Sequence, residues 1–411
     1  MAFDGLYRCL TKARFHRLKP MIHTFMIPRP ALLLFLAATP ALHAQSFFGD
    51  PPDANHPWAV HDMNRPQPPL VTPGTPSTQE KPGTPPSDAI VLFDGTEATL
   101  KNWESDKEGT PPTQWIVKDG ALQCAPGSGY IRTKEQFGDC QLHVEWSAPD
   151  KVEGSSQGRG NSGVFLMGKV EVQVLDNYKN PTYADGFASS VYGVNPPMAN
   201  ALHAPGKWQT YEIIFRRPIH DASGKELDPG RLTVTVNGVV TQDSTPLEGG
   251  GGHKGRSKSS PWPDAGPLKL QDHGNPVRYR NIWYRPLAKR SVDGGTDGHL
   301  SEEVTTAKRA EIAAQIRQDA ASKSGFEATL RQMESLSYAS DAATLATTQK
   351  TAADFLGAIS TLTGANLDAK KDQIKGLHSA MSFLSKHKVI STPYPEESAL
   401  KKIIEEKGWD K

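Results

Sequence analysis

The chain has 411 residues, enough for two or three ordinary domains with cores of their own. Its 46 Lys and Arg residues balance 45 Asp and Glu residues, and this near-neutral charge argues against a nucleic-acid-binding protein, which carries a strongly basic field. A hydrophobic content of 37% is too low for a protein that crosses a membrane many times. The 36 Gly, 33 Pro and 3 Cys residues indicate a turn-rich fold in which disulfides are not the main support.

The N-terminus has the pattern of an export signal. Basic residues precede an apolar run over residues 31–38, and small residues follow at 41–44. We expect residues 1–44 to be a signal peptide that is cleaved after Ala44. The apolar run is shorter than the roughly 20 residues that span a bilayer, so we expect no membrane span after cleavage. The pattern predicts a protein that is exported to the periplasm or the cell exterior.

Residues 45–87 are predicted to form a proline-rich linker. Eleven of the 33 prolines lie between Pro51 and Pro86. Proline cannot donate to a sheet or continue a helix, so a semi-extended tether is expected. A ligand for a proline-recognising module is the alternative.

Residues 88–288 have the pattern of an antiparallel β-sandwich. Short apolar or alternating runs are separated by turn residues at the spacing that is typical of sandwiches. Asn237 and Gly238 supply the turn of the clearest hairpin, because both tolerate positive φ. No helix-length segment interrupts the region, which argues against a parallel βαβ sheet. The expected strands include residues 115–117, 141–146, 163–167, 169–175, 208–215 and the hairpin 231–240.

Two cysteines, Cys124 and Cys140, remain once the signal is removed. They flank neighbouring predicted strands, so in an oxidising compartment they could form one disulfide. Two buried free thiols are the equal alternative, and both stay open at this point.

The C-terminal part changes composition. Residues 289–299 are rich in Gly and Asp and are expected to form a hinge. Residues 300–411 place apolar side chains at helical spacing, with no proline between Leu300 and Thr392. We expect a small bundle of three or four helices followed by a short terminal helix near residues 396–407. The alternative is a pair of helices that binds a protein partner.

The densest polar cluster begins in residues 158–177. Alternation along a strand places Glu171 and Gln173 on one face and the neighbouring valines on the other. Glycines at 158, 160, 163 and 168 would let a ligand approach the backbone closely. A ligand platform and a merely solvated outer face explain this pattern equally well.

A second polar segment covers residues 268–283. It places Asp272, His273, Arg278 and Arg280 around a turn at 274–276. A histidine beside a carboxylate can act as base, acid or metal ligand, although a single histidine in a turn is more often only exposed.

Ordinary two-carboxylate glycoside hydrolysis is difficult to assemble here. Glu171 is followed on its face by Gln173 and Leu175, so the strand lacks a second carboxylate.

The region from about Ala89 to Pro286 resembles the 3-keto-disaccharide hydrolase family of secreted bacterial domains. The resemblance covers about half the chain and does not include the helical region. It depends on ordered motifs at residues 92–95 with Trp103, 160–163, 170–176, 191–193 with Pro196 and Pro197, 206–211, 270–274 and 277–282.

This resemblance implies a concanavalin-like jelly roll that cleaves glycosides oxidised at C3. The 3-ketone acidifies the C2 proton, so one base can remove it and expel the C1 substituent, and hydration completes net hydrolysis. The base would be Glu171 or His273, and a divalent metal held by these two residues is a further hypothesis. Roles in substrate binding follow for Arg159, Asn161, Gln173, Tyr192, Asp272 and Arg278, with Arg159 or Arg278 steadying the oxyanion.

Two other functions compete with this interpretation. One is a non-catalytic carbohydrate-binding or cell-surface module, with the helical region as its interaction partner. The other is an ordinary β-glucanase, which would cleave unoxidised sugars as well.

Overall fold

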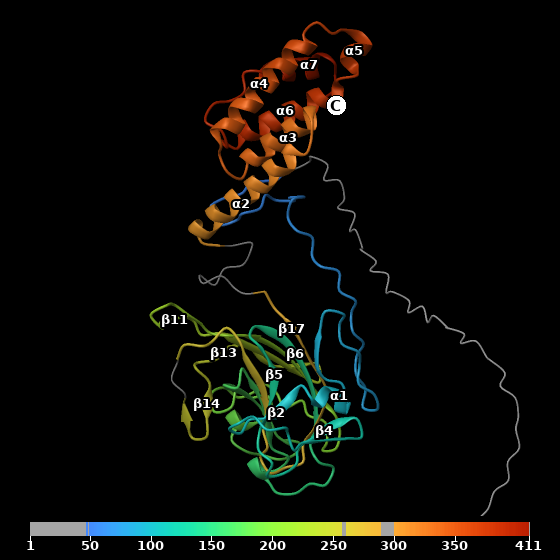
Figure 1. The fold of residues 1–411 in the computed structure, drawn as a ribbon, viewed down its shortest axis with the longest axis vertical. Helices are drawn as coiled ribbons and strands as arrows, with labels where there is room; N and C mark the ends of the chain where they lie inside the picture. Colours follow the sequence, from blue (N-terminus) through green and yellow to red (C-terminus); the bar gives the residue numbers. More distant parts are fainter. Residues whose placement is uncertain (1–46, 48, 257–259, 289–299, 411) are drawn as a thin grey trace, which may run out of the picture. The chain divides into compact units, whose positions relative to one another are not determined.

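The computed structural model describes residues 47, 49–256, 260–288 and 300–410 (Figure 1). The predicted signal peptide at 1–44 and the predicted hinge at 289–299 lie outside these residues.

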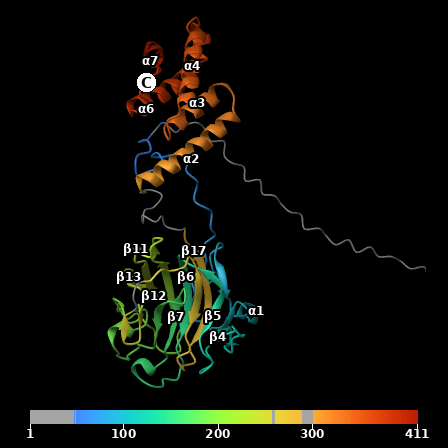
Figure 2. The same ribbon diagram turned by 60° about the vertical axis from the view of Figure 1, so that its left-hand side comes forward.

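The β-rich region is a sandwich of two antiparallel sheets, as the sequence predicts (Figures 1 and 2). The larger sheet has the strand order β13 (Val239–Pro246), β12 (Arg231–Val236), β9 (Gln209–Arg216), β6 (Cys140–Ser147), β17 (Arg278–Pro286), β4 (Ala121–Gln123) and β3 (Ile116–Lys118), and β1 (Ile90–Phe93) also pairs with β17. The smaller sheet has the order β2 (Trp103–Ser105), β5 (Ile131–Phe137), β16 (Gly266–Leu270), β7 (Ser162–Leu166) and β8 (Val170–Val174). Short elements complete the region: α1 (Glu97–Leu100), η1 (Ser156–Gly158), η2 (Ala184–Gly186), and the hairpins β10 (Ile219–His220) with β11 (Glu226–Asp228) and β14 (Gly251–Gly252) with β15 (Gly255–Arg256).

Alternation along the strands builds the core. Leu142, Val144 and Trp146 of β6 are buried in it, as are Val170 and Val172 of β8. The intervening residues of each strand therefore face outward from the sandwich. The predicted hairpin turn is confirmed, because its two central residues have φ values of 51° and 82°.

A bulge in β17 changes which side chains face outward. Asn281 has a φ of 50°, and the pairing with β6 shifts between Arg280 and Trp283. Arg280 lies opposite Glu145 and Trp283 lies opposite His143. Without the extra residue, strict alternation would turn Trp283 toward the core.

Residues 72–87, which we call the strap, form an ordered loop on the larger sheet. The loop is closed by Thr75 N–H donating to the Thr84 carbonyl at 3.0 Å. Ser77 Oγ donates to Glu145 at 2.6 Å, and Gln79 exchanges two hydrogen bonds with the backbone of Trp208. This half of the predicted linker is therefore attached to the sandwich and does not act there as a free tether.

The earlier part of the same segment contacts the helical region. Arg331 Nη1 donates to Asn64 Oδ1 at 2.7 Å, and Asn64 in turn donates to Glu334. The rings of Trp58 and Tyr338 meet edge to face at 6.4 Å. Polar side chains in both halves of the predicted linker therefore have specific partners, which proline content does not reveal.

The C-terminal region is helical, as predicted. Ser301 caps the first helix by accepting from Val304 N–H, and the apolar stripes expected from the sequence, such as Leu377 and Met381, lie in one buried core. Within the described ranges, no helix is long and apolar enough to cross a bilayer. The helices are α2 (Glu302–Ala321), α3 (Gly325–Leu336), α4 (Ala342–Ile359), α5 (Gly364–Asp368), α6 (Lys371–Lys386) and α7 (Glu397–Glu406).

The two cysteines that the sequence left undecided are free and buried. Burial raises the pKa of both thiols, and Asp272 adds to the shift at Cys124. A buried, protonated thiol is a poor nucleophile, so neither cysteine is a candidate catalytic nucleophile.

Candidate functional site

Glu171 lies on the outer face of the smaller sheet. Its neighbours Val170 and Val172 are fully buried in the core, so the carboxyl group points away from it. The structure gives this side chain no hydrogen bond or ion pair among the described residues. Desolvation by burial raises its pKa to about 8. A carboxyl group that is shielded from water without a partner is a candidate acid or base.

The space for this carboxyl group comes from a glycine on the neighbouring strand. A Cβ at Gly163 would overlap Glu171 Oε1 and stand 2.9 Å from the ring of Phe165. Phe165 pairs directly with Glu171 across β7 and β8, and its ring lies 5.8 Å from that of Tyr130. The Glu171 carboxyl group therefore lies against Gly163, which has no side chain, and beside the aromatic rings of Phe165 and Tyr130.

The hydroxyl group of Tyr130 can donate a hydrogen bond to a ligand. Gln271 Nε2 donates to Tyr130 Oη at 2.7 Å, which leaves the phenolic hydrogen free for another acceptor. Burial raises the pKa of Tyr130, and the charge of Glu171 adds to the shift. Gln271 Oε1 is buried without a hydrogen-bond partner among the described residues. An unpartnered buried acceptor is a place where a ligand hydroxyl or a water molecule would bind.

Gln173 and Asn161 are both buried, and both are hydrogen-bonded to Gln157. Gln173 is only 1% exposed, and its amide nitrogen donates to Gln157 Oε1 at 3.1 Å. Asn161 donates to the Gln157 carbonyl at 2.7 Å, and its own Oδ1 is buried without a described partner. Gln173, predicted to bind sugar hydroxyls, is thus already engaged, whereas Asn161 keeps one free acceptor.

Arg159 and Tyr192 flank the site. Arg159 Nε donates to Asp176 at 2.6 Å, so its charge is already paired. Tyr192 N–H donates to the backbone carbonyl of Glu171, and its hydroxyl lies 2.8 Å from that of Tyr183. Burial and this contact raise the pKa of Tyr192, which therefore stays a neutral phenol.

Asp272 and His273, in the second polar segment at 268–283, do not form a catalytic dyad. Asp272 accepts hydrogen bonds from Gly129 N–H at 2.8 Å and Gly274 N–H at 2.9 Å. Burial opposes ionisation of Asp272, but these backbone groups still hold its pKa below its usual value. The His273 side chain is exposed and the structure gives its imidazole no described partner. Asp272 therefore fixes the turn, and His273 is not oriented by it.

Arg278 lies on the other sheet. It belongs to β17, where Tyr279 faces the core and Arg278 faces outward from the larger sheet. Its guanidinium lies 3.4 Å from Ser147 Oγ and 5.4 Å from the Trp208 ring. The sequence prediction that groups Arg278 with Glu171 needs this correction, because closeness along the chain does not reveal which sheet a strand joins.

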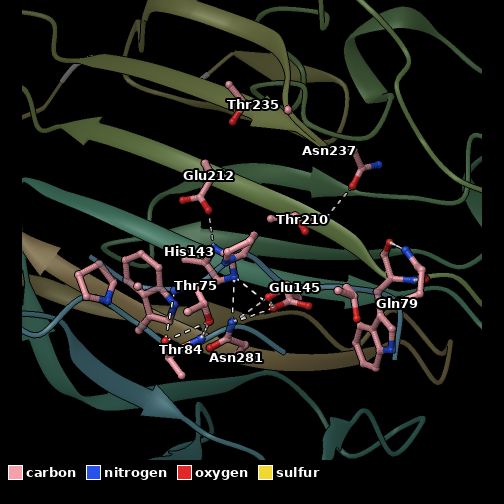
Figure 3. Close-up of a pocket in the computed structure, with 18 of the residues that line it drawn as sticks. Thr75, Gln79, Thr84, His143, Glu145, Thr210, Glu212, Thr235, Asn237 and Asn281 are labelled. Carbon is pink, nitrogen blue, oxygen red and sulfur yellow. Dashed lines mark hydrogen bonds and ion pairs between the residues drawn. The ribbon is translucent and has the colours of Figure 1, made fainter. Parts of the chain in front are cut away.

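A second polar cluster lies on the outer face of the larger sheet, under the strap. His143 Nδ1 is 2.5 Å from Glu212 and its Nε2 is 3.2 Å from Glu145 (Figure 3). Glu145 also accepts from Arg280 Nε at 2.7 Å and from Asn281 Nδ2 at 2.8 Å. The His143 ring stacks on Trp283 at 4.9 Å.

The charges of this cluster stabilise one another. Burial would lower the pKa of His143, but the two glutamates raise it to about 9, so the imidazole is protonated near neutral pH. Burial likewise opposes ionisation of Glu145, yet the hydrogen bonds from His143, Ser77, Asn281 and Arg280 lower its pKa. The result is a compensated set of two cations and two carboxylates.

Of this cluster, His143, Glu145, Glu212, Asn281 and Trp283 border a cavity of about 650 Å³. The sequence predicts the strand at 141–146, but its polar residues are not among the predicted site residues. The signal was present, because His143 and Glu145 alternate with Leu142, Val144 and Trp146. The cavity is lined by Gly74–Gln79, Thr84, Pro86, His143, Glu145, His203, Trp208, Thr210, Glu212, Thr235, Asn237, Gly238, Asn281 and Trp283.

Comparison with known proteins agrees with the sandwich and its motifs. The model of the 3-keto-α-glucoside-1,2-lyase-like domain matches residues 88–285. A crystal structure of a candidate glycosyl hydrolase from Parabacteroides distasonis is 43% identical, with a TM-score of 0.52, and the match covers 56% of this chain and 95% of that one. The sandwich domain of this chain, residues 88–285, belongs to the family of 3-keto-α-glucoside-1,2-lyase-like domains.

Two further solved structures match at lower identity. Another candidate glycosyl hydrolase from P. distasonis is 17% identical, with a TM-score of 0.37, over 49% of this chain and 94% of that one. The carbohydrate-binding module CBM66 from Bacillus subtilis is 10% identical, with a TM-score of 0.27, over 44% and 93%. No curated protein with which the chain was compared matches it.

The residues of this family domain do not assemble a full metal site in the described part of the chain. There, no group of three or more His, Cys, Asp or Glu side chains is placed to hold a metal ion. Glu171 and His273 share no hydrogen bond, and the exposed imidazole of His273 has no described partner that would orient it as a ligand. The donor set of the described residues does not fit a divalent metal.

Proposed function

We propose that the domain at residues 88–288 is an exported glycosidase-type enzyme that cleaves 3-keto-glycosides by elimination, with Glu171 as the base. The observation that carries the proposal is the desolvated carboxyl group of Glu171, which has no described partner and lies beside Tyr130. The family of the domain and the glycosyl hydrolase description of the P. distasonis relative support the substrate class.

The chemistry needs a single base at the start. Glu171 removes the proton from C2 of the sugar, and the electron pair moves toward the C3 ketone to give an enolate. The enolate then re-forms the ketone as a C1–C2 double bond develops, and the C1–O bond breaks. The leaving oxygen takes up a proton, which the Glu171 carboxylic acid can return. Addition of water across the double bond gives net hydrolysis.

Burial suits Glu171 to this role. A general base works best when its pKa is close to the working pH, because it is then both deprotonated and strongly basic. The usual pKa of a glutamate, 4.5, would make it a weak base for a carbon acid, whereas a pKa of about 8 makes it a much stronger one.

Tyr130 is the donor best placed to stabilise the enolate. Because its oxygen accepts from Gln271, its hydrogen can point to a developing oxyanion. Arg159 is paired with Asp176 and Arg278 lies on the other sheet, so neither is free for this task. Asn161 and Gln271 each keep an acceptor for sugar hydroxyls.

The test compares a 3-keto-disaccharide with its unoxidised parent in D₂O. We expect cleavage of the keto sugar alone, and a C2 position that exchanges with solvent faster than in an enzyme-free control. Glu171→Gln should lower turnover at least 10³-fold, whereas the exposed control Glu153→Gln should not change it. Binding without turnover would favour a carbohydrate-binding module, and cleavage of both sugars would favour a β-glucanase.

The same assay examines the remaining predictions for this site. We expect His273→Ala to retain turnover, because its imidazole is exposed and not oriented. Loss of activity in His273→Ala with full activity in Glu171→Gln would reverse the assignment of the base. Export is tested separately by the N-terminus of the mature protein, which we expect to begin after Ala44.

A further inference from the structure

The cavity under the strap contains polar groups that nothing in the described protein satisfies. Glu212 Oε2 and Trp283 Nε1 are buried and have no hydrogen-bond partner. Both residues line the cavity, together with Thr210 and Thr235, whose hydroxyl groups also have no described partner. A buried polar atom without a partner costs free energy unless water or a ligand satisfies it.

These groups are of complementary types. Glu212 Oε2 is an acceptor, Trp283 Nε1 is a donor, and the two threonine hydroxyls can act as either. Figure 3 shows Glu212, Thr210 and Thr235 on the neighbouring strands β9 and β12, on the same side as His143. A ligand that satisfies all of them must carry several hydrogen-bonding groups that donate and accept, as the hydroxyl groups of a sugar do.

The charges indicate that this ligand is neutral. His143 and Arg280 offset Glu145 and Glu212, and short contacts already join these four groups. A charged ligand would therefore be attracted by two of these groups and repelled by the other two. A volume of about 650 Å³ lies within the range of pockets for small ligands, roughly 300–1,000 Å³.

The cavity cannot be part of the Glu171 site. Glu171 faces outward from the smaller sheet, and the cavity lies on the outer face of the larger one. The buried side chains of both sheets, such as Val172 and Val144, form the core between them. One sugar unit cannot contact both faces.

We propose that the cavity between the strap and the larger sheet is a second saccharide-binding site, which holds a neutral, unoxidised sugar apart from the catalytic face. The strap covers the cavity and is held there by hydrogen bonds from Ser77 to Glu145 and from Gln79 to the backbone of Trp208. Such a site would keep the enzyme on a saccharide while the opposite face acts on oxidised units. It goes beyond the proposed reaction and does not depend on Glu171.

The test measures binding of maltose, cellobiose and trehalose to the full chain by titration calorimetry. Thr235→Tyr places a bulky ring in the cavity, and Ile214→Tyr is the matched control, because Ile214 is an exposed residue of the neighbouring strand that does not line the cavity. We expect at least one disaccharide to bind, at least tenfold weaker binding to Thr235→Tyr, and unchanged binding to Ile214→Tyr. Thermal unfolding of both variants checks that they are folded.

Turnover separates this proposal from the proposed reaction. Thr235→Tyr should cleave the 3-keto-disaccharide at the normal rate, and Glu171→Gln should still bind the unoxidised sugar. Absence of binding by all three disaccharides, or equal binding by wild type and Thr235→Tyr, would overturn the second site. Loss of turnover in Thr235→Tyr with full turnover in Glu171→Gln would overturn both proposals, because the cavity would then be the catalytic site.

Discussion

The carboxyl group of Glu171 occupies the volume that a side chain at Gly163 would fill. The φ of Gly163 is not positive, so space and not backbone conformation requires glycine there. We predict that Gly163→Ala displaces the carboxyl group and lowers turnover of a 3-keto-disaccharide about 10²-fold, the effect of moving a catalytic group by about 1 Å. The crowding should also cost about 1–3 kcal/mol of unfolding free energy.

Gly158→Ala is the matched control for this variant. Gly158 precedes the same strand, and a Cβ there would have no atom within 4 Å. Its turnover should equal that of the wild type. Equal activity in both alanine variants would show that the position of the Glu171 carboxyl group does not matter for the reaction.

The burial of Glu171 predicts the pH dependence of the reaction. The base must be deprotonated, so kcat/KM for a 3-keto-glycoside should rise with pH and reach half its maximum near pH 8, the pKa of this group. Initial rates between pH 5 and 9.5 measure this profile. A midpoint near 4.5, the usual value for glutamate, would mean that the catalytic group is solvated.

The ion pair of Arg280 with Glu145 should stabilise the fold far more than the pair of Arg285 with Asp88. The first pair is nearly buried, with side chains 7% and 1% exposed, and the second is 30% and 40% exposed. Arg280→Gln leaves a buried carboxylate without one of its two cationic partners, which costs about 3–5 kcal/mol. Arg285→Gln should cost about 0–1 kcal/mol.

Urea unfolding followed by near-ultraviolet circular dichroism compares these two variants. Arg280 also donates to the Thr78 carbonyl in the strap, so Arg280→Gln should make residues 72–87 sensitive to proteolysis in the native state. Similar losses in the two variants would contradict the difference in burial.

His143 should make stability depend on pH in the alkaline range. Its pKa is about 9 in the folded protein and 6.5 without its partners, so folding takes up a proton between these values. The stabilisation is complete below about pH 6.5 and is lost as pH rises through 9. His143→Phe keeps a ring against Trp283 but cannot titrate. The difference in unfolding free energy between wild type and variant should therefore shrink from pH 6 to pH 9.5, and a constant difference would refute the assignment.

Local patterns predicted much of the sandwich and part of the site. Alternation in residues 170–174 placed Glu171 and Gln173 on the face opposite the valines, because each strand has one buried side. The turn at Asn237 and Gly238 followed from the φ values that these residues tolerate.

Contacts between distant segments could not be predicted in this way. Which sheet β17 joins decides the place of Arg278, and a bulge at Asn281 decides the direction of Trp283. The proline content of residues 45–87 predicted an extended backbone but not the hydrogen bond from Ser77 to Glu145, which lies 68 residues further along the chain.

The strap has a practical consequence for dividing the protein into parts. The family match begins at residue 88, immediately after the strap ends. A recombinant fragment cut at that boundary would retain every strand of the sandwich but expose Glu145 and Arg280 to solvent. Such a fragment loses the hydrogen bonds of Ser77 and Gln79 to the larger sheet, so it should be less stable than one that begins near residue 70, although both contain the complete family domain.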